Sequence, residues 1–493
     1  MNFKTTFIQG CFLASLCAHS VFAEAKLNIL ILYADDMGFG DLAIQNPDSK
    51  IPTPYLDKLA TQGMRFTNGH SSSGICTPSR YALLTGRYHW RDFHGIVQSF
   101  GKSVFKAEQL TLPEMLQEAG YHTAAIGKWH LGWDWDSIRK PGTKGTHFEA
   151  FDWEKPIADG PLAHGFDHYF GDTVINFPPY AWIEDDRMLQ IPDRMKKDSL
   201  WKPLKEGKWE ARPGPMVTGW DPYEVLPEMT RRAVTYINGR KEAKEPFFMY
   251  FAFPSPHAPI VPTEEFEGTS EAGPYGDFVV QTDWTCGQLL QALEDNGLAE
   301  NTIVIFSADN GAEHYAYPRA MKYDHWSSEP FRGAKRDTYE GGHRVPFIVK
   351  WPGVIESGAV SDALISQIDL MATLAAVNGS EIPEGEAADS QNLLPLWKGE
   401  TTVLRSDMVH NTFNNDYAVR QGDWVLIAAK TGNHNKGRSR EFEAKRGYQR
   451  DDALPVELYN LRTDPAQRVN MAKENPEKVQ SMLALLDKIK HPN

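Results

Sequence analysis

The sequence predicts an α/β protein with a large mixed, mostly parallel sheet flanked by helices and a smaller α+β subdomain at the C-terminus. Uninterrupted apolar runs, such as residues 28–33 and 247–253, are typical of strands buried on both faces of a parallel sheet. Helical patterns with recognisable caps separate these runs. After about residue 400 the pattern changes to short strands and an amphipathic helix near residues 475–490.

The chain begins with the features of an export signal. Lys4 is the only charged residue before Glu24, an apolar run follows it, and Val21 and Ala23 occupy the −3 and −1 positions for cleavage after residue 23. This run is too short to span a bilayer as a mature helix, and no later segment has the long uncharged run that a span needs. We therefore predict a periplasmic or secreted protein without a membrane anchor.

The composition excludes several classes of protein. The 493-residue chain has a net charge of −14, so it is a poor candidate for nucleic-acid binding, and an anionic substrate would need positive charge concentrated in a pocket. Of four cysteines only Cys76 and Cys286 lie beyond the export signal, which excludes a disulfide scaffold. Two alternatives remain: one Cys76–Cys286 bridge, or a reactive Cys76 with Cys286 used for packing.

The first predicted strand, residues 28–33, ends in the adjacent acids Asp35 and Asp36. The carboxyl end of a buried strand is where α/β sheets place their ligands. Neighbouring carboxylates repel each other unless something neutralises them, and a hard cation would do so. The alternative is a loop with two solvated carboxylates.

A helix predicted at residues 53–60 is stopped by Gly63, and a second one begins near Pro78, because proline is favoured in a first helical turn. Cys76 therefore lies at or just before a helix N-terminus, with Arg80 one turn on. Free N–H groups and the helix dipole favour negative charge there. The pattern suggests an activated nucleophile beside an anion; a buried packing cysteine is equally compatible with it.

Thr111 and Glu114 have the spacing of a capping box before the next predicted helix. A short strand at residues 122–126 follows and leads to Lys128 and His130. In strand geometry these two side chains would point the same way, because the side-chain period is two. Alone, such a pair is more often a surface feature.

From residue 133 to residue 220 the pattern weakens into long loops rich in tryptophan. Loops of this length often carry specificity, and tryptophan rings can stack on sugars. For most of them we expect a packing role instead. The tryptophans are Trp133, Trp135, Trp153, Trp182, Trp201, Trp209 and Trp220.

Three more predicted strands lie close to residues that can carry chemistry: His257 after residues 247–253, Asp309 and Asn310 after residues 302–306, and Lys335 in the loop before residues 347–351. From these patterns we predict a signal peptide at residues 1–23, a main domain at 24–400 and a C-terminal α+β subdomain at 401–493. The last of these contains a basic segment, residues 430–450, which we expect to be a flexible loop, either solvated or touching an anionic polymer.

Four apolar strands thus end in polar clusters, and consecutive βα units bring strand ends to one side of a sheet. The acids and the amide offer only oxygen, which suits Ca²⁺ or Mg²⁺ rather than zinc. The histidines and lysines suit an oxyanion and its proton transfers. The sequence therefore predicts a divalent cation holding an oxyanion against a nucleophile. The clustered residues are Asp35, Asp36, Lys128, His130, His257, Asp309 and Asn310.

With these residues assembled, the chain resembles the formylglycine-dependent (type I) sulfatases of the alkaline phosphatase superfamily, from Asn28 to about Trp351. The matching segments are C-T-P-S-R from Cys76, L-T-G-R from Leu84, G-K-W-H-L-G from Gly127, the surroundings of His257, D-N-G from Asp309 and G-A-K from Gly333.

The resemblance implies that a maturation enzyme oxidises Cys76 to formylglycine (3-oxoalanine), whose hydrated aldehyde is the nucleophile. It also implies one Ca²⁺, held by an oxygen of residue 76 and by Asp35, Asp36, Asp309 and Asn310.

The resemblance further assigns roles to five side chains. Arg80 and Lys128 would orient and stabilise the hydrate while one hydroxyl attacks sulfur in line. His257, with Lys335, would assist departure of the alcohol oxygen. His130 would then take the proton of the second hydroxyl, so that sulfate leaves and the aldehyde returns. Cations around the sulfuryl oxygens and a donor at the leaving oxygen are where stabilisation should be strongest.

Two rival functions remain open: a phosphate or phosphonate ester hydrolase of the same superfamily, and a non-catalytic protein that binds sulfated glycans. The export signal, the tryptophan-rich loops and the basic 430–450 segment favour a sulfated carbohydrate, such as the algal galactan carrageenan, over a small aryl sulfate. The sequence indicates neither the sugar nor an oligomeric state.

Overall fold

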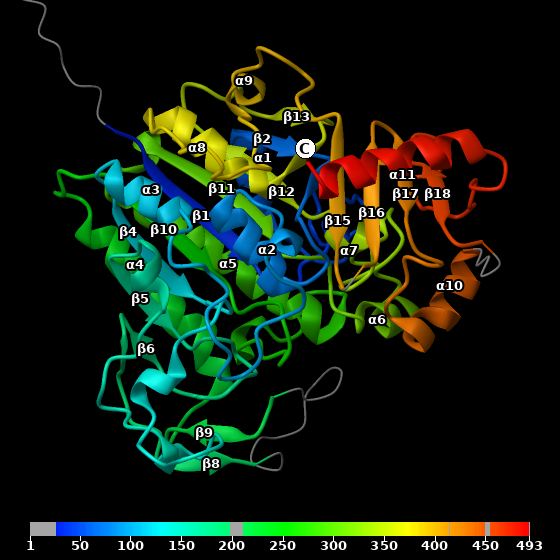
Figure 1. Cartoon of the computed structure of the whole chain (residues 1–493). Helices are drawn as coiled ribbons and strands as arrows, with labels where there is room; N and C mark the ends of the chain where they lie inside the picture. The colour runs from blue at the N-terminus through cyan, green and yellow to red at the C-terminus, as the bar shows by residue number, and fades with distance from the viewer. Residues whose placement is uncertain (1–25, 198–210, 414, 449–453, 493) are drawn as a thin grey trace, which may run out of the picture.

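The computed structural model describes residues 26–197, 211–413, 415–448 and 454–492 (Figure 1). The predicted signal peptide, Trp201 and Trp209 lie outside these residues. Within them, no helix combines the length and the apolar character needed to cross a membrane.

The main body is built on one ten-stranded sheet, and its centre is parallel. Strand β1 lies between β11 and β10, and β4 and β5 continue the sheet beyond β10. The five central strands are β11 Thr302–Ala308, β1 Asn28–Ala34, β10 Phe247–Ala252, β4 His122–Gly127 and β5 His168–Gly171.

Antiparallel pairings occur only toward the margins of this sheet, so the predicted mixed, mostly parallel sheet is confirmed. The marginal strands are β12 Phe347–Lys350, β2 Met64–Phe66 and β13 Ala359–Ser361 beyond β11, and β6 Ile183–Glu184 and β7 Arg187–Met188 beyond β5. Two short pairs lie outside it: β3 Gly69–His70 with β14 Ile365–Ser366, and β8 Arg194–Lys196 with β9 Gly214–Met216.

Strand β1 feeds two hydrophobic cores, because its side chains alternate between the two faces of the sheet. Leu30 and Leu32 belong to one core, and Ile29 and Ile31 belong to the other. The first core is closed by α1 Pro54–Gln62, α4 Val225–Gly239, α5 Gly273–Asp295 and α6 Ala316–Tyr323, the second by α2 Cys76–Thr85, α3 Leu112–Glu118, α8 Leu370–Asn378 and α9 Leu394–Trp397.

A four-stranded antiparallel sheet forms the C-terminal part, seen in orange and red at one side of Figure 1. Its strands are β15 Asp407–Asn411, β16 Tyr417–Gln421, β17 Trp424–Ile427 and β18 Glu457–Asn460, with α11 Pro476–Lys490 packed against them. The apolar cluster below α11 also includes Ala82 of α2, so this sheet shares a core with the helix that begins at Cys76. The smaller α+β subdomain is therefore confirmed, while its predicted boundary at residue 400 stays a prediction.

Several local predictions are confirmed. Gly63 caps α1, Thr111 and Glu114 form the capping box of α3, and Cys76 is the first residue of α2. Cys76 and Cys286 are both free thiols, so the bridge alternative is not realised. The expected packing role of the tryptophans holds for the buried rings Trp133, Trp135, Trp153 and Trp220, with Trp182 partly buried.

Two predicted loops contain helix instead. The basic segment 430–450 includes α10 Arg440–Arg446, which buries Phe442 and Glu443, so the prediction of a flexible loop is wrong for that part. Phe442 packs against Trp326, and this apolar anchor holds a stretch whose charge alone indicated solvation. The loop before β12 contains the single turn α7 Glu340–His343.

Candidate active site

The carboxyl ends of β1, β4, β10 and β11 meet at one place, and every site residue predicted from the sequence lies there in a buried position. Asp35 and Asp36 follow β1, Lys128 follows β4, and His257 lies beyond β10. Of the remaining members, His130 lies in the loop after β4, and the others come from the loop after β11, from α2 and from the loop before α7. None of the ten is more than 7% exposed: Asp35, Asp36, Cys76, Arg80, Lys128, His130, His257, Asp309, Asn310 and Lys335.

The oxygen atoms of this cluster fit a hard cation. Ligand atoms of Asp35, Asp309 and Cys76 lie within 4.8 Å of one another, and so do those of Asp35, Asp36 and His257. Asp35 Oδ1 and Asn310 Oδ1 are buried and accept no hydrogen bond from any residue that the structure describes. Burial raises the pKa of both Asp35 and Asp36, because an ionised carboxylate loses its hydration there. A bound divalent cation would offset this cost of keeping the carboxylates ionised.

Three buried cations surround the carboxylates. Arg80 donates from Nε and Nη2 to Asp309 Oδ2 at 3.0 and 2.8 Å. Lys128 Nζ lies 2.6 Å from Asp35 Oδ2, and Lys335 Nζ lies 2.8 Å from Asp36 Oδ2. Burial alone would raise the pKa of Asp309, but Arg80 and the two lysines outweigh it and hold this pKa at about 2.

Cys76 begins α2 with no side chain capping the helix, so the free N–H groups of the first turn face this region. Its Sγ lies in a buried environment, where burial raises the pKa of the thiol in spite of Lys128 and Lys335. A thiol in this state is a weak nucleophile, because the thiolate is the reactive form. The geometry therefore places residue 76 beside the buried carboxylates without activating it as a cysteine.

The two histidines of the site are held by main-chain carbonyls. His130 Nε2 lies 3.0 Å from the oxygen of Val97, and His257 Nδ1 lies 2.6 Å from the oxygen of Ala258. Burial, with help from the lysines, lowers the pKa of both imidazoles well below the usual value. A neutral ring that donates to a carbonyl keeps its other nitrogen as an acceptor. His130 Nδ1, which has no partner among the described residues, is therefore available to take a proton.

The prediction that Lys128 and His130 point the same way in strand geometry is wrong for His130. Strand β4 ends at Gly127, and His130 has a left-handed backbone with φ 55°, so the period of two stops before it. Lys128 and His130 still approach the same centre, because Lys128 pairs with Asp35 while His130 lines a pocket beside Cys76.

This pocket has a volume of about 90 Å³ and opens above Cys76. Sequence reasoning missed several of its lining residues, since nothing in their local pattern marks them. Glu313 and Arg336 each lie one to three residues from a predicted site residue, which is the one signal that pointed to them. The missed lining residues with polar or aromatic side chains are Asn176, Phe177, Arg212, Glu313, Arg336 and Phe413.

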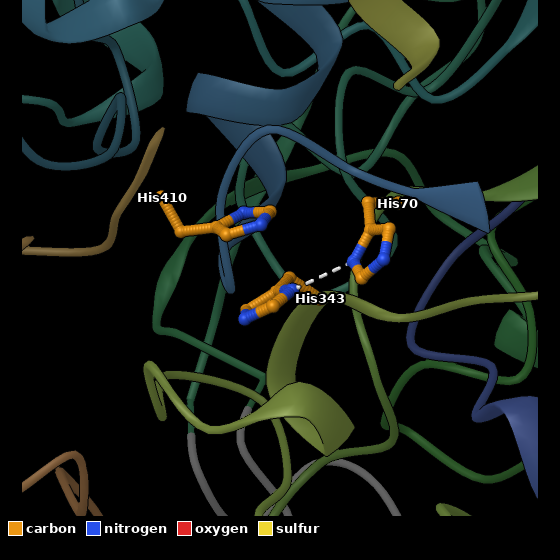
Figure 2. Close-up of side chains that lie close together, drawn as sticks. All are labelled: His70, His343 and His410. Atoms are coloured by element: carbon orange, nitrogen blue, oxygen red, sulfur yellow. Dashed lines mark hydrogen bonds between the residues drawn. The ribbon is translucent and has the colours of Figure 1, made fainter. Parts of the chain in front are cut away.

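A second buried cluster lies apart from the pocket and consists of His70, His343 and His410 (Figure 2). His70 Nδ1 is 3.1 Å from His343 Nδ1, while the rings of His343 and His410 stack with centroids 3.5 Å apart and planes 13° apart. An imidazole binds a metal in its own plane, and two nearly parallel stacked rings share no such point. The cluster therefore acts as a packing contact of neutral rings between β3, α7 and β15.

Comparison with known proteins identifies the family to which this fold belongs. The sulfatase family model matches residues 27–380, so the chain belongs to the sulfatase family and is a sulfuric ester hydrolase. The model described as "N-sulphoglucosamine sulphohydrolase, C-terminal" matches residues 333–491.

Among curated relatives, an N-acetylgalactosamine-6-O-sulfatase of Bacteroides thetaiotaomicron is 32% identical, with 94% of this chain and 93% of that protein aligned. The human N-acetylgalactosamine-6-sulfatase is 35% identical over 83% of this chain and 70% of its own length. A solved structure from work on the metabolism of multiple glycosaminoglycans by B. thetaiotaomicron has a TM-score of 0.79 and 31% identity over 95% of this chain and all of that chain.

Proposed function

We propose that this sulfatase removes the 6-O-sulfate ester of N-acetylgalactosamine units in a sulfated glycan and releases inorganic sulfate. The observation that carries the substrate is the similarity to two N-acetylgalactosamine 6-sulfatases at more than 30% identity, one of them over nearly the whole chain. The buried oxygen cluster next to Cys76 supports the reaction, because Cys76 lies within 4.8 Å of ligand atoms of Asp35 and Asp309 and also lines the pocket.

Residue 76 is, in this proposal, formylglycine produced by a maturation enzyme, and it supplies the oxygen nucleophile that a buried thiol does not provide. One Ca²⁺ supplies charge for the sulfuryl oxygens. Asp35, Asp36, Asp309 and Asn310 hold this ion through carboxylate and amide oxygens, which are the ligands that Ca²⁺ prefers. The orphaned oxygens of Asp35 and Asn310 support this ligand set.

The chain's own side chains carry the charges and protons of the reaction. Arg80 is fixed by its two hydrogen bonds to Asp309, and with Lys128 it stabilises negative charge at residue 76. His130 Nδ1 accepts the proton that is released there. His257 Nε2 and Lys335 Nζ both lie beside Asp36 and line the pocket. Lys335, as an ammonium group, donates to the departing sugar oxygen, and His257 assists as a hydrogen-bond acceptor at Nε2.

Export to the periplasm or the medium belongs to the same proposal, because a polymeric sulfated glycan would be encountered outside the cytoplasm. Maturation at Cys76 would accompany export. The predicted signal peptide supports it. Carrageenan remains a sequence prediction. A structure in complex with a neocarrahexaose has a TM-score of 0.71 but only 22% identity, so that likeness shows the fold alone.

The test is sulfate release from a panel of pure, desalted substrates by the matured enzyme. We expect the highest kcat/KM for N-acetylgalactosamine 6-sulfate, with the 4-sulfate and carrageenan oligosaccharides at least tenfold lower, a difference of about 1.4 kcal/mol in transition-state stabilisation. A higher kcat/KM for the matching 6-phosphate would indicate a phosphatase. Binding of the sulfated sugar without any sulfate release would indicate a glycan-binding protein.

A further inference from the structure

Glu313 is a buried carboxylate at the pocket wall that none of the proposed steps uses. It lies three residues beyond Asn310 in the loop after β11, is 4% exposed and lines the same pocket as Cys76 and His257. A carboxylate in this position would repel an anionic substrate unless cations neutralise it.

Glu313 pairs with two neighbouring cations, Arg336 and Lys335. Arg336 forms a bidentate pair with it, and Nη2 of that pair lies 2.8 Å from Oε2. Lys335 Nζ lies 3.6 Å from the same Oε2, and the main-chain N–H of His314 donates to Oε1 at 2.7 Å. Burial would raise the pKa of Glu313, but Arg336 and Lys335 outweigh it and hold this pKa well below its ordinary value. The carboxylate is therefore ionised and shared between two adjacent cations.

The segment that carries these cations is held in an unusual backbone conformation. Arg336 has φ 81°, which costs free energy for a residue with a side chain. The N–H of Lys335 donates to Ala312 at 2.9 Å, and the N–H of Arg336 donates to Gly74 at 2.7 Å. The segment thus bridges the loop that precedes Cys76 and the loop that contains Glu313, and the salt bridges of Glu313 fix its side chains.

We propose that Glu313 is a positioning residue that aims Lys335 at the departing sugar oxygen, an inference that rests on the proposed function. Lys335 Nζ also lies 2.6 Å from Asp36 Oδ1, but a cation bound by Asp36 competes for that carboxylate. Glu313 is then the other carboxylate within 4 Å of Lys335 among the described residues, and it keeps the ammonium group at the wall of the pocket.

The test compares two leaving groups in the matured Glu313→Gln enzyme. A misplaced Lys335 should lower kcat about 10- to 100-fold for a sugar 6-sulfate, with a smaller change in KM. Nitrophenol is a much stronger acid than a sugar alcohol and leaves with little help, so kcat for 4-nitrophenyl sulfate should fall less than about threefold. In a Lys335→Ala background, Glu313→Gln should cost little more. Glu313→Asp, which keeps the charge, should recover part of the loss.

Glu340→Gln is the matched control. Glu340 is also buried and pairs with Arg344 at 3.0 Å and Arg420 at 3.3 Å, but it does not line the pocket. Its variant should lower the melting temperature and leave the ratio of the two kcat values at the wild-type level.

Equal losses on both substrates in Glu313→Gln, or an undiminished loss in the Lys335→Ala background, would overturn the positioning role. The proposed function fails separately, when the wild type releases no sulfate from any sugar. A series of aryl sulfates with weaker phenol acids then decides the role of Glu313: a loss that grows as the phenol becomes less acidic supports it, and a constant loss refutes it.

Discussion

The cluster of His70, His343 and His410 should make the fold sensitive to mild acid. Burial lowers the pKa of all three rings, to about 4 for His343 and well below the ordinary value for the other two. Neighbouring histidines and the arginines Arg344 and Arg420 oppose protonation further, and Glu340, which pairs with both arginines, only partly offsets them. The three rings are therefore neutral in the folded protein at pH 7.

The sign and size of the effect follow from proton linkage. An unfolded histidine titrates near pH 6.5, so below that pH the unfolded chain binds up to three more protons at these positions than the folded one. Their stabilising contribution is complete above pH 6.5 and is lost as the pH falls toward the folded pKa values. Each site lowers the free energy of unfolding by about 1.4 kcal/mol per pH unit, or about 4 kcal/mol per unit for all three between pH 6 and pH 5.

The substitution His410→Phe removes the contribution of one histidine to this pH dependence. Among the described residues the ring nitrogens of His410 have no side-chain hydrogen-bond partner and interact only with the main chain of Ser72, and a phenyl ring can keep the stacking on His343, so the substitution removes a titrating group at small cost in contacts. Urea unfolding at several pH values with Ca²⁺ present should show a slope about 1.4 kcal/mol per pH unit shallower than that of the wild type. An unchanged slope in His410→Phe would refute the neutral, buried state of this ring.

Three other predictions concern the site and its scaffold. Cys76→Ala should abolish sulfate release while the melting temperature stays within a few degrees, and mass spectrometry of the active protein should find an aldehyde mass at residue 76. Removal of Ca²⁺ with a chelator should abolish activity and lower the melting temperature. Ca²⁺ added back at about 100 times its Kd should raise the free energy of unfolding by about 2.7 kcal/mol. In Asp309→Asn, most of this stabilisation by Ca²⁺ should be lost. Thr111→Ala should lower the free energy of unfolding by about 1 kcal/mol because Thr111 caps α3, whereas Thr111→Ser should retain most of it.

The central strands were predictable because burial on both faces leaves an uninterrupted apolar run. β1 and β11 feed the two cores with alternate side chains and therefore need no polar face. The strand-end residues were predictable for a related reason: parallel strands place their carboxyl ends together, so Asp35 and Asp309 had to be neighbours once both strands were recognised. Helix α10 was missed, because its charge indicated a loop and its single apolar anchor, Phe442, is visible only beside Trp326.

The wall of the pocket could not be predicted, because its residues meet only through tertiary packing. Arg336 reaches the site through a left-handed backbone that no sequence rule assigns to arginine. Asn176 and Phe413 come from segments with no helical or strand pattern, and they meet Cys76 only when the long loops fold over the sheet. Local periodicity predicts where a strand ends, but it carries no information on tertiary contacts between distant loops.

The charges of the site explain how an acidic protein attracts an anion. Four carboxylates and four cations balance formally in the buried cluster around Cys76, and Arg212 at the pocket wall adds one positive charge. A divalent ion would add two more positive charges and so strengthen the attraction for an anion. Ca²⁺ and sulfate should therefore bind cooperatively, and by linkage each should raise the affinity of the other by the same factor. Calorimetric titration of inorganic sulfate should show a Kd at least about tenfold lower with Ca²⁺ present than without it. Equal affinities would mean that the lysines and arginines alone attract the anion. The balancing residues are Asp35, Asp36, Asp309 and Glu313 against Arg80, Lys128, Lys335 and Arg336.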